Sequence, residues 1–447
     1  MVLARNIIEE LKAVPVDPIN FKTLYSAKEF KAQIVGLIRA ATKRIYIAAL
    51  YLEDDEAGRE IFDEIYQAKQ NNPELDVQIC VDWHRAQRGL IGAEESDGNA
   101  ALYTRMANSH DHPVPVYGVP VRGREVFGVL HLKGFIFDDT VLYSGASLNN
   151  IYLHNQDKYR FDRYHQITSP EIADSMVAFM AQSLIADPAV NLLTKKERPT
   201  TKSLKSAIRQ LRSKLVSTNY RFKHSAVAES EQLAITPLLG VGKRRNLLNT
   251  SIIQLLRDAR EEVVICTPYF NFPKSVEKEL RKALRRGVKV TIVVGDKTAN
   301  DFFISPEEEF KTVGGLPYLY EMNLRRFLKA NEANIASRKL DMLLWKHEDN
   351  SYHLKGMWVD KTRMLITGNN LNPRAWKLDL ENALLIQDKN GLVQEQFEQE
   401  FENIFQHTQR IGSYKHIEKV ENYPDAVQKL LRKVTRVKAD RVLKQLL

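Results

Sequence analysis

One stretch decides the fold of this 447-residue chain: His131-Leu-Lys-Gly-Phe-Ile-Phe-Asp-Asp-Thr-Val-Leu-Tyr-Ser-Gly-Ala-Ser-Leu-Asn149. It occurs again in the second half as His353-Leu-Lys-Gly-Met-Trp-Val-Asp-Lys-Thr-Arg-Met-Leu-Ile-Thr-Gly-Asn-Asn-Leu-Asn372. Both copies place Lys two residues and Asp seven residues after His, and then Gly and Asn four residues apart; these residues are His131, Lys133, Asp138, Gly145 and Asn149, and His353, Lys355, Asp360, Gly368 and Asn372. A repeat of this kind predicts two similar domains.

The spacing of His and Lys in each copy predicts that the two side chains work together. Residues i and i+2 of a strand point to the same face, so His131 and Lys133 are expected to project together, as are His353 and Lys355. Two amphipathic strands whose His and Lys merely face solvent would explain neither the duplication nor the Gly and Asn that follow each copy.

Two histidines and two lysines that meet at one point suit phosphodiester chemistry. A neutral imidazole can attack phosphorus at neutral pH, because its ordinary pKa is about 6.5, and a second, protonated imidazole can donate to the leaving oxygen. The ammonium groups of Lys133 and Lys355 can hold the oxygens that gain negative charge, and the amides of Asn149 and Asn372 can donate to the same oxygens. Because no acidic cluster or Cys/His spacing accompanies the motifs, we expect neither a metal nor a cofactor.

Length and composition indicate a globular protein of two domains. A chain of 447 residues is too long for one ordinary core. Its composition, 44% hydrophobic and 27% charged, is typical of a globular protein. No apolar run approaches the roughly 18 residues of a spanning helix, and the N-terminus lacks the apolar centre of a signal peptide, so we expect a cytoplasmic protein. Cys80 and Cys266 lie in strand-like runs and predict no disulfide or metal site. The net charge of +9 suits nucleic acid, ribosomes and anionic membranes equally.

The chain around the motifs alternates between helix and strand patterns. Ser26-Ala-Lys-Glu29 is a capping box followed by apolar residues at helical spacing. The further elements expected are a strand at 44–51, a helix at 56–69 and a strand at 76–82, and in the second half a helix at 247–259, a strand at 262–268, a helix at 275–286 and a strand at 289–295. This alternation predicts an α/β fold.

Composition divides the chain into four parts. We expect one motif-bearing domain at 1–193, a basic connector at 194–231, a second motif-bearing domain at 232–423 and a basic amphipathic helix at 424–447. The connector suits a solvated helix better than an arm that binds anions. The C-terminal helix is equally suited to an anionic bilayer and to packing its apolar stripe on the domain.

The paired motifs resemble those of the phospholipase D superfamily, and flanking stretches resemble its Gram-negative phosphatidylserine synthases, which are CDP-diacylglycerol–serine O-phosphatidyltransferases. The stretches that carry this resemblance are Val81-Asp-Trp-His-Arg-Ala-Gln-Arg-Gly89, Pro115-Val-Tyr-Gly-Val-Pro120, Tyr159-Arg-Phe-Asp-Arg-Tyr-His165, Gly295-Asp-Lys-Thr-Ala-Asn-Asp301 and Gly368-Asn-Asn-Leu-Asn-Pro-Arg-Ala-Trp376. The resemblance implies two α-β-α sandwich domains related by a pseudo-two-fold axis, with one shared active site.

The resemblance also implies roles for individual residues. A phosphohistidine forms on His131 as nucleophile, while His353 acts first as acid and then as base; sequence symmetry alone leaves this choice open. Each histidine is oriented by an acid further along, Glu381 for His353 and Asp162 for His131. The motif residues Asp138 and Asp360, like Gly145 and Gly368, are then structural. Ala146 and Asn369 depart from the superfamily pattern, because many members carry Ser after the glycine.

The reaction implied is transfer of the phosphatidyl group of CDP-diacylglycerol to L-serine, with release of CMP. The enzyme would lie in the cytoplasm, peripherally on the inner face of the cytoplasmic membrane; the family also associates with ribosomes. A hydrolase, a cardiolipin-synthase-like transferase or a nuclease of the superfamily shares the same site. An inactive repeat that binds nucleic acid needs no paired histidines, and we expect no specific nucleic-acid partner. The sequence gives no oligomeric state.

Several other segments have two interpretations. Arg85, Arg88 and Lys297 follow corresponding strands and are candidates for binding substrate, with surface salt bridges as the alternative. The apolar segments 302–304 and 316–320 suit core packing better than contact with acyl chains.

Overall fold

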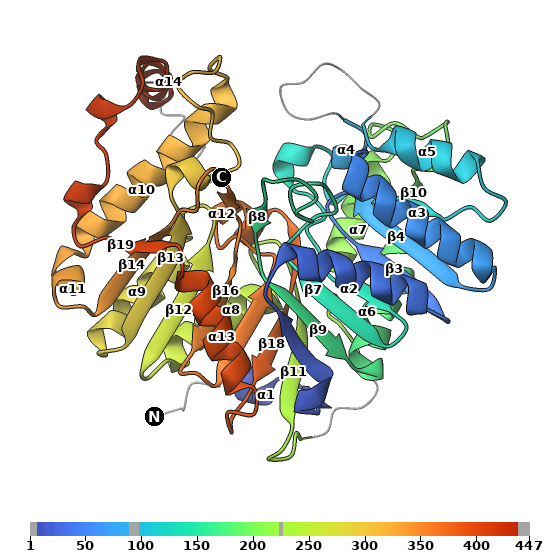
Figure 1. The fold of residues 1–447 in the computed structure, drawn as a ribbon, viewed down its shortest axis with the longest axis horizontal. Helices are drawn as coiled ribbons and strands as arrows, with labels where there is room; N and C mark the ends of the chain where they lie inside the picture. Colours follow the sequence, from blue (N-terminus) through green and yellow to red (C-terminus); the bar gives the residue numbers. More distant parts are fainter. Residues whose placement is uncertain (1–6, 89–97, 223–226, 437–447) are drawn as a thin grey trace.

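The computed structural model describes residues 7–88, 98–222 and 227–436, and it shows two α/β halves lying side by side (Figure 1). The first half contains an eight-stranded sheet in the order β10-β5-β4-β3-β6-β7-β9-β2, and the second a nine-stranded sheet in the order β1-β11-β18-β17-β16-β12-β13-β14-β19. The strands of the first sheet are β2 (Phe21–Leu24), β3 (Arg44–Ala48), β4 (Asp76–Asp82), β5 (Val116–Val119), β6 (Phe135–Phe137), β7 (Thr140–Ser144), β9 (Tyr164–Thr168) and β10 (Asn191–Leu192). Those of the second are β1 (Val14–Val16), β11 (Leu233–Val241), β12 (Glu262–Thr267), β13 (Lys289–Gly295), β14 (Leu340–Trp345), β16 (Gly356–Val359), β17 (Arg363–Thr367), β18 (Leu380–Gln387) and β19 (Thr408–Arg410).

The two sheets repeat the same arrangement of strands around their centres. In the first, β3 pairs in parallel with β4 on one side and antiparallel with β6, the strand after the first motif, on the other. In the second, β12 does the same with β13 and with β16, the strand after the second motif. The predicted repeat of α/β units is therefore confirmed.

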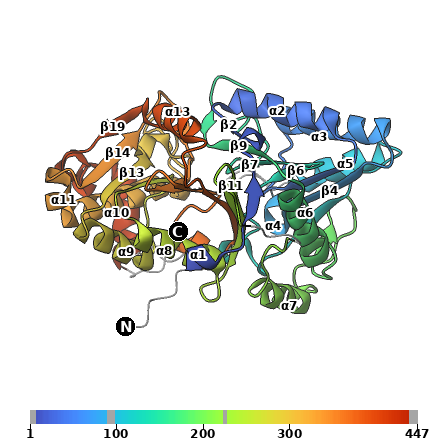
Figure 2. The ribbon, with the colours of Figure 1, turned by 90° about the horizontal axis from the view of Figure 1, so that it is seen from below.

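Helices cover both faces of each sheet (Figure 2). In the first half α2 and α3 pack on one face and α6 on the other, and in the second half α8 and α9 lie opposite α13. The helices are α1 (Ile7–Glu10), α2 (Ala27–Ala40), α3 (Glu56–Asn71), α4 (Trp83–Ala86), α5 (Ala100–Asn108), α6 (Pro170–Phe179), α7 (Lys205–Leu215), α8 (Leu247–Asp258), α9 (Lys274–Arg285), α10 (Leu316–Ala330), α11 (Glu332–Ala336), α12 (Pro373–Lys377), α13 (Gln394–Phe405) and α14 (Asp425–Arg436). The N-cap of the expected capping box is present, because the Ser26 hydroxyl accepts a hydrogen bond from the Glu29 N–H before α2, while the Glu29 carboxylate accepts from the N–H of Tyr25 rather than from that of Ser26.

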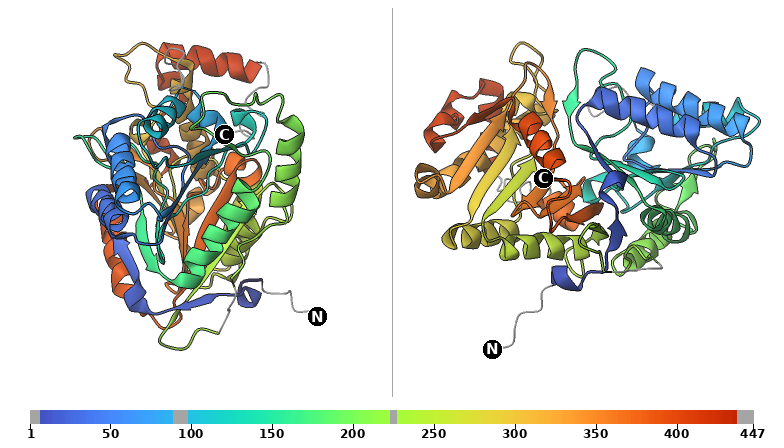
Figure 3. Two further views of the ribbon diagram at one scale, coloured as in Figure 1. Left: turned by 90° about the vertical axis from the view of Figure 1, so that its right-hand side faces the viewer. Right: turned by 60° about the horizontal axis from the view of Figure 1, so that its bottom comes forward.

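A single apolar core joins the two halves. It contains Tyr46 and Cys80 from the first sheet together with Cys266 and Val293 from the second. The chain also crosses between the sheets at its start, since β1 pairs with β11 of the second sheet while β2 forms the edge of the first. The short α1 contacts α8 beneath the second half (Figure 3). The domain limits expected from composition remain a prediction.

The two basic segments both form helices with a packed apolar face. In the connector, α7 buries Ile208, Leu211 and Leu215 in the shared core. In the C-terminal segment, α14 buries Val427 and Leu431 against the aromatic rings of α10 and its neighbours. Of the two alternatives for the C-terminal helix, Val427 and Leu431 thus follow the one in which the apolar stripe packs on the domain. Residues 437–447 lie outside the described residues. Among the described helices, none is both long and apolar enough to cross a membrane.

Candidate active site

The His-x-Lys segments lie between the halves, directly before β6 and β16 and outside the regular strands expected for them. Gly134 and Gly356, which follow the lysines, have φ values of 119° and 148°; β6 begins directly after Gly134, and β16 begins at Gly356. The backbone of each segment pairs with the other half instead. The N–H of His131 donates to the carbonyl of Leu380 at 2.9 Å, and the N–H of His353 donates to the carbonyl of Phe161 at 2.9 Å.

Each histidine is held by an acid from the opposite half. Nδ1 of His131 lies 3.0 Å from both carboxylate oxygens of Glu381, and Nδ1 of His353 lies 2.8 Å from Oδ2 of Asp162. The expected pairing within each half is therefore wrong, although the same four residues are involved.

The backbone pairing between the halves explains this exchange. The short strands β8 (Arg160–Phe161) and β15 (Ser351–Tyr352) run parallel, with Tyr352 opposite Phe161. The residues that directly follow these two strands, Asp162 and His353, are thereby brought together. In the other pair of segments, a parallel bridge between Leu130 and Leu380 aligns the residues that follow them in the same way.

The two lysines are almost fully buried, with 1% of each residue exposed. Nζ of Lys133 donates to the carbonyl of Ala146 at 3.2 Å. Nζ of Lys355 donates to Asp162 at 3.1 Å and also contacts Nδ1 of His353.

The motif glycines give these lysines room across the two halves. A Cβ atom on Gly145 would lie 2.7 Å from Nζ of Lys355, and a Cβ atom on Gly368 would lie 2.8 Å from Cγ of Lys133. The glycine shared by the two motifs thus has a steric reason, because any larger residue would displace the lysine of the other half.

The pKa values of the two histidines shift in the same direction, whereas those of the two acids shift in opposite directions. Burial and the charge of Lys133 lower the pKa of His131 well below its ordinary value, and burial and Lys355 lower that of His353 to about 3. Burial raises the pKa of Glu381 to about 8, against the charges of Lys133 and Lys355. At Asp162 burial is outweighed by the charge of Lys355 and the hydrogen bond from His353, which lower the pKa to about 2.

The motif asparagines use their side-chain oxygens within the protein. Oδ1 of Asn149 accepts from the N–H of Tyr152 at 2.9 Å, and Oδ1 of Asn372 accepts from the N–H of Ala375 at 2.9 Å. Nδ2 of Asn149 donates to Glu53 at 2.8 Å. Both asparagines line the cavity described below, with their carbonyl ends fixed.

The motif aspartates Asp138 and Asp360 hold turns at the far ends of β6 and β16. Asp138 accepts hydrogen bonds from three successive backbone N–H groups at residues 42–44, and Asp360 does the same at residues 260–262. Both residues have φ values of 50°. Their contacts are all with the scaffold.

A cavity of about 1180 Å³ opens over both histidines. Its wall includes His131, His353, Lys133 and both motif asparagines, together with Arg85 and Arg88. Arg85 stacks on Tyr51, 4.2 Å from the ring centroid, and Arg88 pairs with Glu125.

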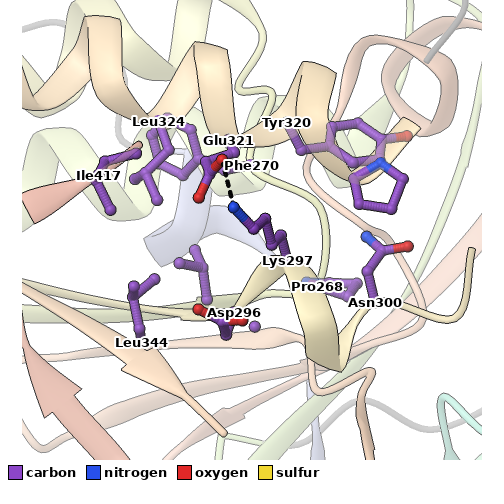
Figure 4. Close-up of a pocket in the computed structure, with 13 residues that line it drawn as sticks. Pro268, Phe270, Asp296, Lys297, Asn300, Tyr320, Glu321, Leu324, Leu344 and Ile417 are labelled. Atoms are coloured by element: carbon purple, nitrogen blue, oxygen red, sulfur yellow. Dashed lines mark hydrogen bonds and ion pairs between the residues drawn. The ribbon is translucent and has the colours of Figure 1, made fainter. Parts of the chain in front are cut away.

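Lys297 does not line this cavity. It lies in a separate pocket of about 20 Å³ beneath α10, where its ammonium contacts Glu321 at 3.3 Å (Figure 4). The same ammonium also contacts Glu418 at 2.5 Å. The rings of Tyr318 and Tyr423 lie 5.4 Å from the same nitrogen. These partners neutralise Lys297 and pack it against the helix, which corresponds to the salt-bridge alternative.

Apolar residues form part of the cavity wall where core packing was expected. The cavity is lined by the half-buried residues Phe302, Phe303 and Ile304. It is also lined by the half-buried Leu316 at the start of α10 and by the buried Tyr320. Segment 302–304 both lines the cavity and packs on a core, since Phe303 lies against the apolar cluster formed by α10 and α14; composition does not show whether an apolar loop covers a core, a cavity or both.

Two residues at the site were not anticipated from the sequence. The hydroxyl of Tyr152 lies 3.1 Å from both ring nitrogens of His353. The Asn382 side chain accepts from the N–H of Lys133 at 2.9 Å and donates to its carbonyl at 2.7 Å, which fixes the backbone of that lysine. The sequence signal that could have indicated them is their proximity to expected site residues, because Tyr152 lies three residues after Asn149 and Asn382 directly follows Glu381. Within the described residues, no three His, Cys, Asp or Glu side chains are grouped as metal ligands are.

Comparison with known proteins agrees with this geometry. A family model described as "Cardiolipin synthase, PLD-like domain" matches residues 252–405. The chain is 26% identical to a CDP-diacylglycerol–glycerol-3-phosphate 3-phosphatidyltransferase of Schizosaccharomyces pombe, over 94% of this chain and 95% of that one.

Two bacterial enzymes are much more similar. The chain is 51% identical to the CDP-diacylglycerol–serine O-phosphatidyltransferase of Haemophilus influenzae, covering 97% of this chain and 96% of that one, and 48% identical to the enzyme of the same activity from Escherichia coli, covering 97% and 95%. The crystal structure of phosphatidylserine synthase from Haemophilus influenzae Rd KW20 superposes with a TM-score of 0.95, covering 99% of this chain and 98% of that one. The chain therefore belongs to the CDP-diacylglycerol–serine O-phosphatidyltransferase family of phospholipase D-like proteins.

Proposed function

We propose that this protein transfers the phosphatidyl group of CDP-diacylglycerol to L-serine and releases CMP, through a covalent intermediate on His131. One observation carries the proposal within this family. Two buried imidazoles, one from each half, face one cavity, and each has its Nδ1 held by a carboxylate. This arrangement fixes the tautomer and leaves Nε2 of His131 to attack.

The two acids support different roles for the two histidines. Asp162 stays ionised because its pKa is lowered to about 2, so a permanent negative charge stabilises a proton on His353 once the anionic substrate has bound. Glu381, with its raised pKa, supports a protonated His131 less well. We therefore assign His131 as nucleophile and His353 as acid and base.

The reaction then proceeds in two displacements. Nε2 of His131 forms a bond to the diacylglycerol-bearing phosphorus while the bond to the CMP oxygen breaks, and His353 gives its proton to that oxygen. His353 next takes the proton of the serine hydroxyl, whose oxygen forms the new bond to phosphorus as the bond to His131 breaks. Lys133 and Lys355 stabilise the charge on the non-bridging oxygens.

The mouth of the cavity supports peripheral docking on an anionic membrane. Val126 and Phe127 are each 47% exposed and Phe310 is 36% exposed, although all three are large apolar residues. Val126 also lines the cavity, and the exposed basic residues Arg124 and Lys311 accompany this rim. Apolar side chains beside cations suit the interface of an anionic bilayer, where the acyl chains of the substrate already lie. Location at the inner face of the cytoplasmic membrane and association with ribosomes stay predictions from the sequence.

The test is release of CMP from CDP-diacylglycerol in detergent micelles, with the lipid product followed in parallel reactions containing L-serine, glycerol 3-phosphate or neither. We expect serine-dependent phosphatidylserine, and loss of CMP release in His131→Ala but not in the control His416→Ala, whose histidine is exposed. Formation of a lipid product with glycerol 3-phosphate but not with serine would overturn the assignment of serine as the acceptor. Unchanged CMP release in His131→Ala would overturn the mechanism.

A further inference from the structure

Two charged side chains lie in the cavity with no part in the steps above. Arg160 comes from β8 of the first half and Asp301 from the loop after β13 of the second, and both line the cavity. Nη1 of Arg160 lies 3.5 Å from Oδ2 of Asp301, and their side chains are 13% and 17% exposed. The pair thus presents one positive and one negative group to the same enclosed space.

Each member of the pair contacts a tyrosine that lies beside His353. The guanidinium of Arg160 lies 4.7 Å from the ring centroid of Tyr152, whose hydroxyl is 3.1 Å from the ring nitrogens of His353. The hydroxyl of Tyr269 donates to Asp301 at 2.7 Å, and its ring lies 6.3 Å from the imidazole of His353. The charged pair is therefore part of the surroundings of His353.

The order of bond changes places the acceptor at the same end of the cavity. In an in-line displacement the entering oxygen approaches phosphorus opposite the bond that breaks. If phosphorus is bound to His131, as the proposed function requires, serine must enter opposite that bond and give its proton to His353. The groups that recognise the rest of serine must lie within reach of His353.

The chemistry of the pair matches that of the acceptor. L-serine carries a carboxylate and an ammonium on the carbon next to its hydroxymethyl group. A guanidinium binds a carboxylate through two parallel hydrogen bonds, and a carboxylate flanked by aromatic rings binds an ammonium. Such rings are present, because Tyr269 stacks on Tyr320 with centroids 5.3 Å apart. We propose that Arg160 binds the α-carboxylate and Asp301 the α-ammonium of serine, with the serine hydroxyl facing His353.

A second charged pair in the cavity does not compete for this role. Arg85 and Glu53 lie 3.9 Å apart, but Glu53 accepts a hydrogen bond from Asn149 at 2.8 Å and Arg85 stacks on Tyr51. These contacts already engage both members of the pair with neighbouring side chains of the first half.

The test separates the two half-reactions in Asp301→Asn and Arg160→Met. Exchange of labelled CMP into CDP-diacylglycerol without serine reports the first half-reaction alone, and we expect it to stay within about threefold of the unchanged protein. The KM for L-serine should rise at least about tenfold, as expected when a charge-assisted hydrogen bond is lost. Asp341→Asn is the matched control, because it disrupts an Arg–Asp pair with Arg410 that does not line the cavity.

A comparison of acceptors gives a readout that a structural defect does not produce. Ethanolamine lacks the carboxylate, so Arg160→Met should reduce the preference for serine over ethanolamine, whereas Asp301→Asn should weaken both amines. An unchanged serine KM, or equal loss of CMP exchange and serine use, would overturn the assignment. Absence of CMP exchange in the unchanged protein would instead contradict the proposed function.

Discussion

Arg163 of the first half binds Glu400 of the second through two parallel hydrogen bonds, from Nε to Oε1 at 2.7 Å and from Nη2 to Oε2 at 2.9 Å. Its guanidinium also lies 3.9 Å from the ring centroid of Trp358. Since Arg163 directly follows Asp162, this buried ion pair fixes the segment that holds His353. It joins the two halves immediately behind the active site.

Loss of this pair should destabilise the protein strongly. Arg163→Met leaves the carboxylate of Glu400 buried without its main partner, and we expect about 3–5 kcal/mol less free energy of unfolding, measured by urea denaturation. The control Lys158→Met removes an exposed pair with Asp349 and should leave the free energy of unfolding nearly unchanged. Equal effects of the two variants would show that Arg163 contributes no more than a surface charge.

The carboxylates behind the histidines should be needed for catalysis but not for folding. Glu381→Gln and Asp162→Asn keep the shape of each side chain while removing the charge that selects the histidine tautomer. We expect kcat for CMP release to fall by about 10²–10⁴-fold in each. Circular dichroism should show unchanged secondary structure. Activity within about threefold of the unchanged protein would rule out this role.

The dependence of kcat/KM on pH should be bell-shaped, with its maximum between about pH 7 and pH 8. Burial raises the pKa of Glu381 to about 8, so the carboxylate that accepts from His131 is lost as the pH falls below this value. Burial and the charge of Lys355 lower the pKa of Lys133 to about 7, so its ammonium is lost as the pH rises. Because the groups interact, the two apparent values belong to the cluster.

The measurement is CMP release at low CDP-diacylglycerol from pH 5 to pH 10. Glu381→Gln has no carboxyl proton to lose, so its residual activity should no longer decline on the acid side. A profile in Glu381→Gln with the same acid limb would assign that limb to another group.

The motif glycines offer a steric test of the lysine positions. Gly145→Ala brings a methyl group within 2.7 Å of Nζ of Lys355 and of Oδ2 of Asp162, so both must shift. We expect kcat to fall by about 10²-fold, because small misplacements of catalytic groups are costly. Gly36→Ala in α2 is the control, since its added Cβ meets no atom within 4 Å. A kcat for Gly145→Ala equal to that of the control would contradict the tight packing of this site.

The sequence predicted the repeated architecture well because its signals are local. The capping box at Ser26 and the periodic apolar residues after it define α2 without any knowledge of the rest of the chain. The paired motifs likewise identified the two histidines and two lysines that line the cavity or lie against it. Glu381 and Asp162 were expected to be partners of the histidines only because of the resemblance to the superfamily.

Contacts between the halves could not be predicted in this way. Spacing along the chain suggested that Glu381 serves His353, but β8 and β15 pair across the halves and reverse the choice. Lys297 follows its strand as the arginines do, yet α10 covers it with Glu321. Hydrophobic pattern also could not distinguish the cavity wall at Phe302 from a core, since both require apolar side chains.

The crossed supply of acids has a consequence for how such a chain can evolve. If either half stood alone, only a pairing with an identical copy would complete its histidine, and symmetry would then force the same acid onto both imidazoles. Joining the two halves in one polypeptide frees Asp162 and Glu381 to differ. Division of labour between the two imidazoles is therefore available to the fused chain and closed to a symmetric dimer.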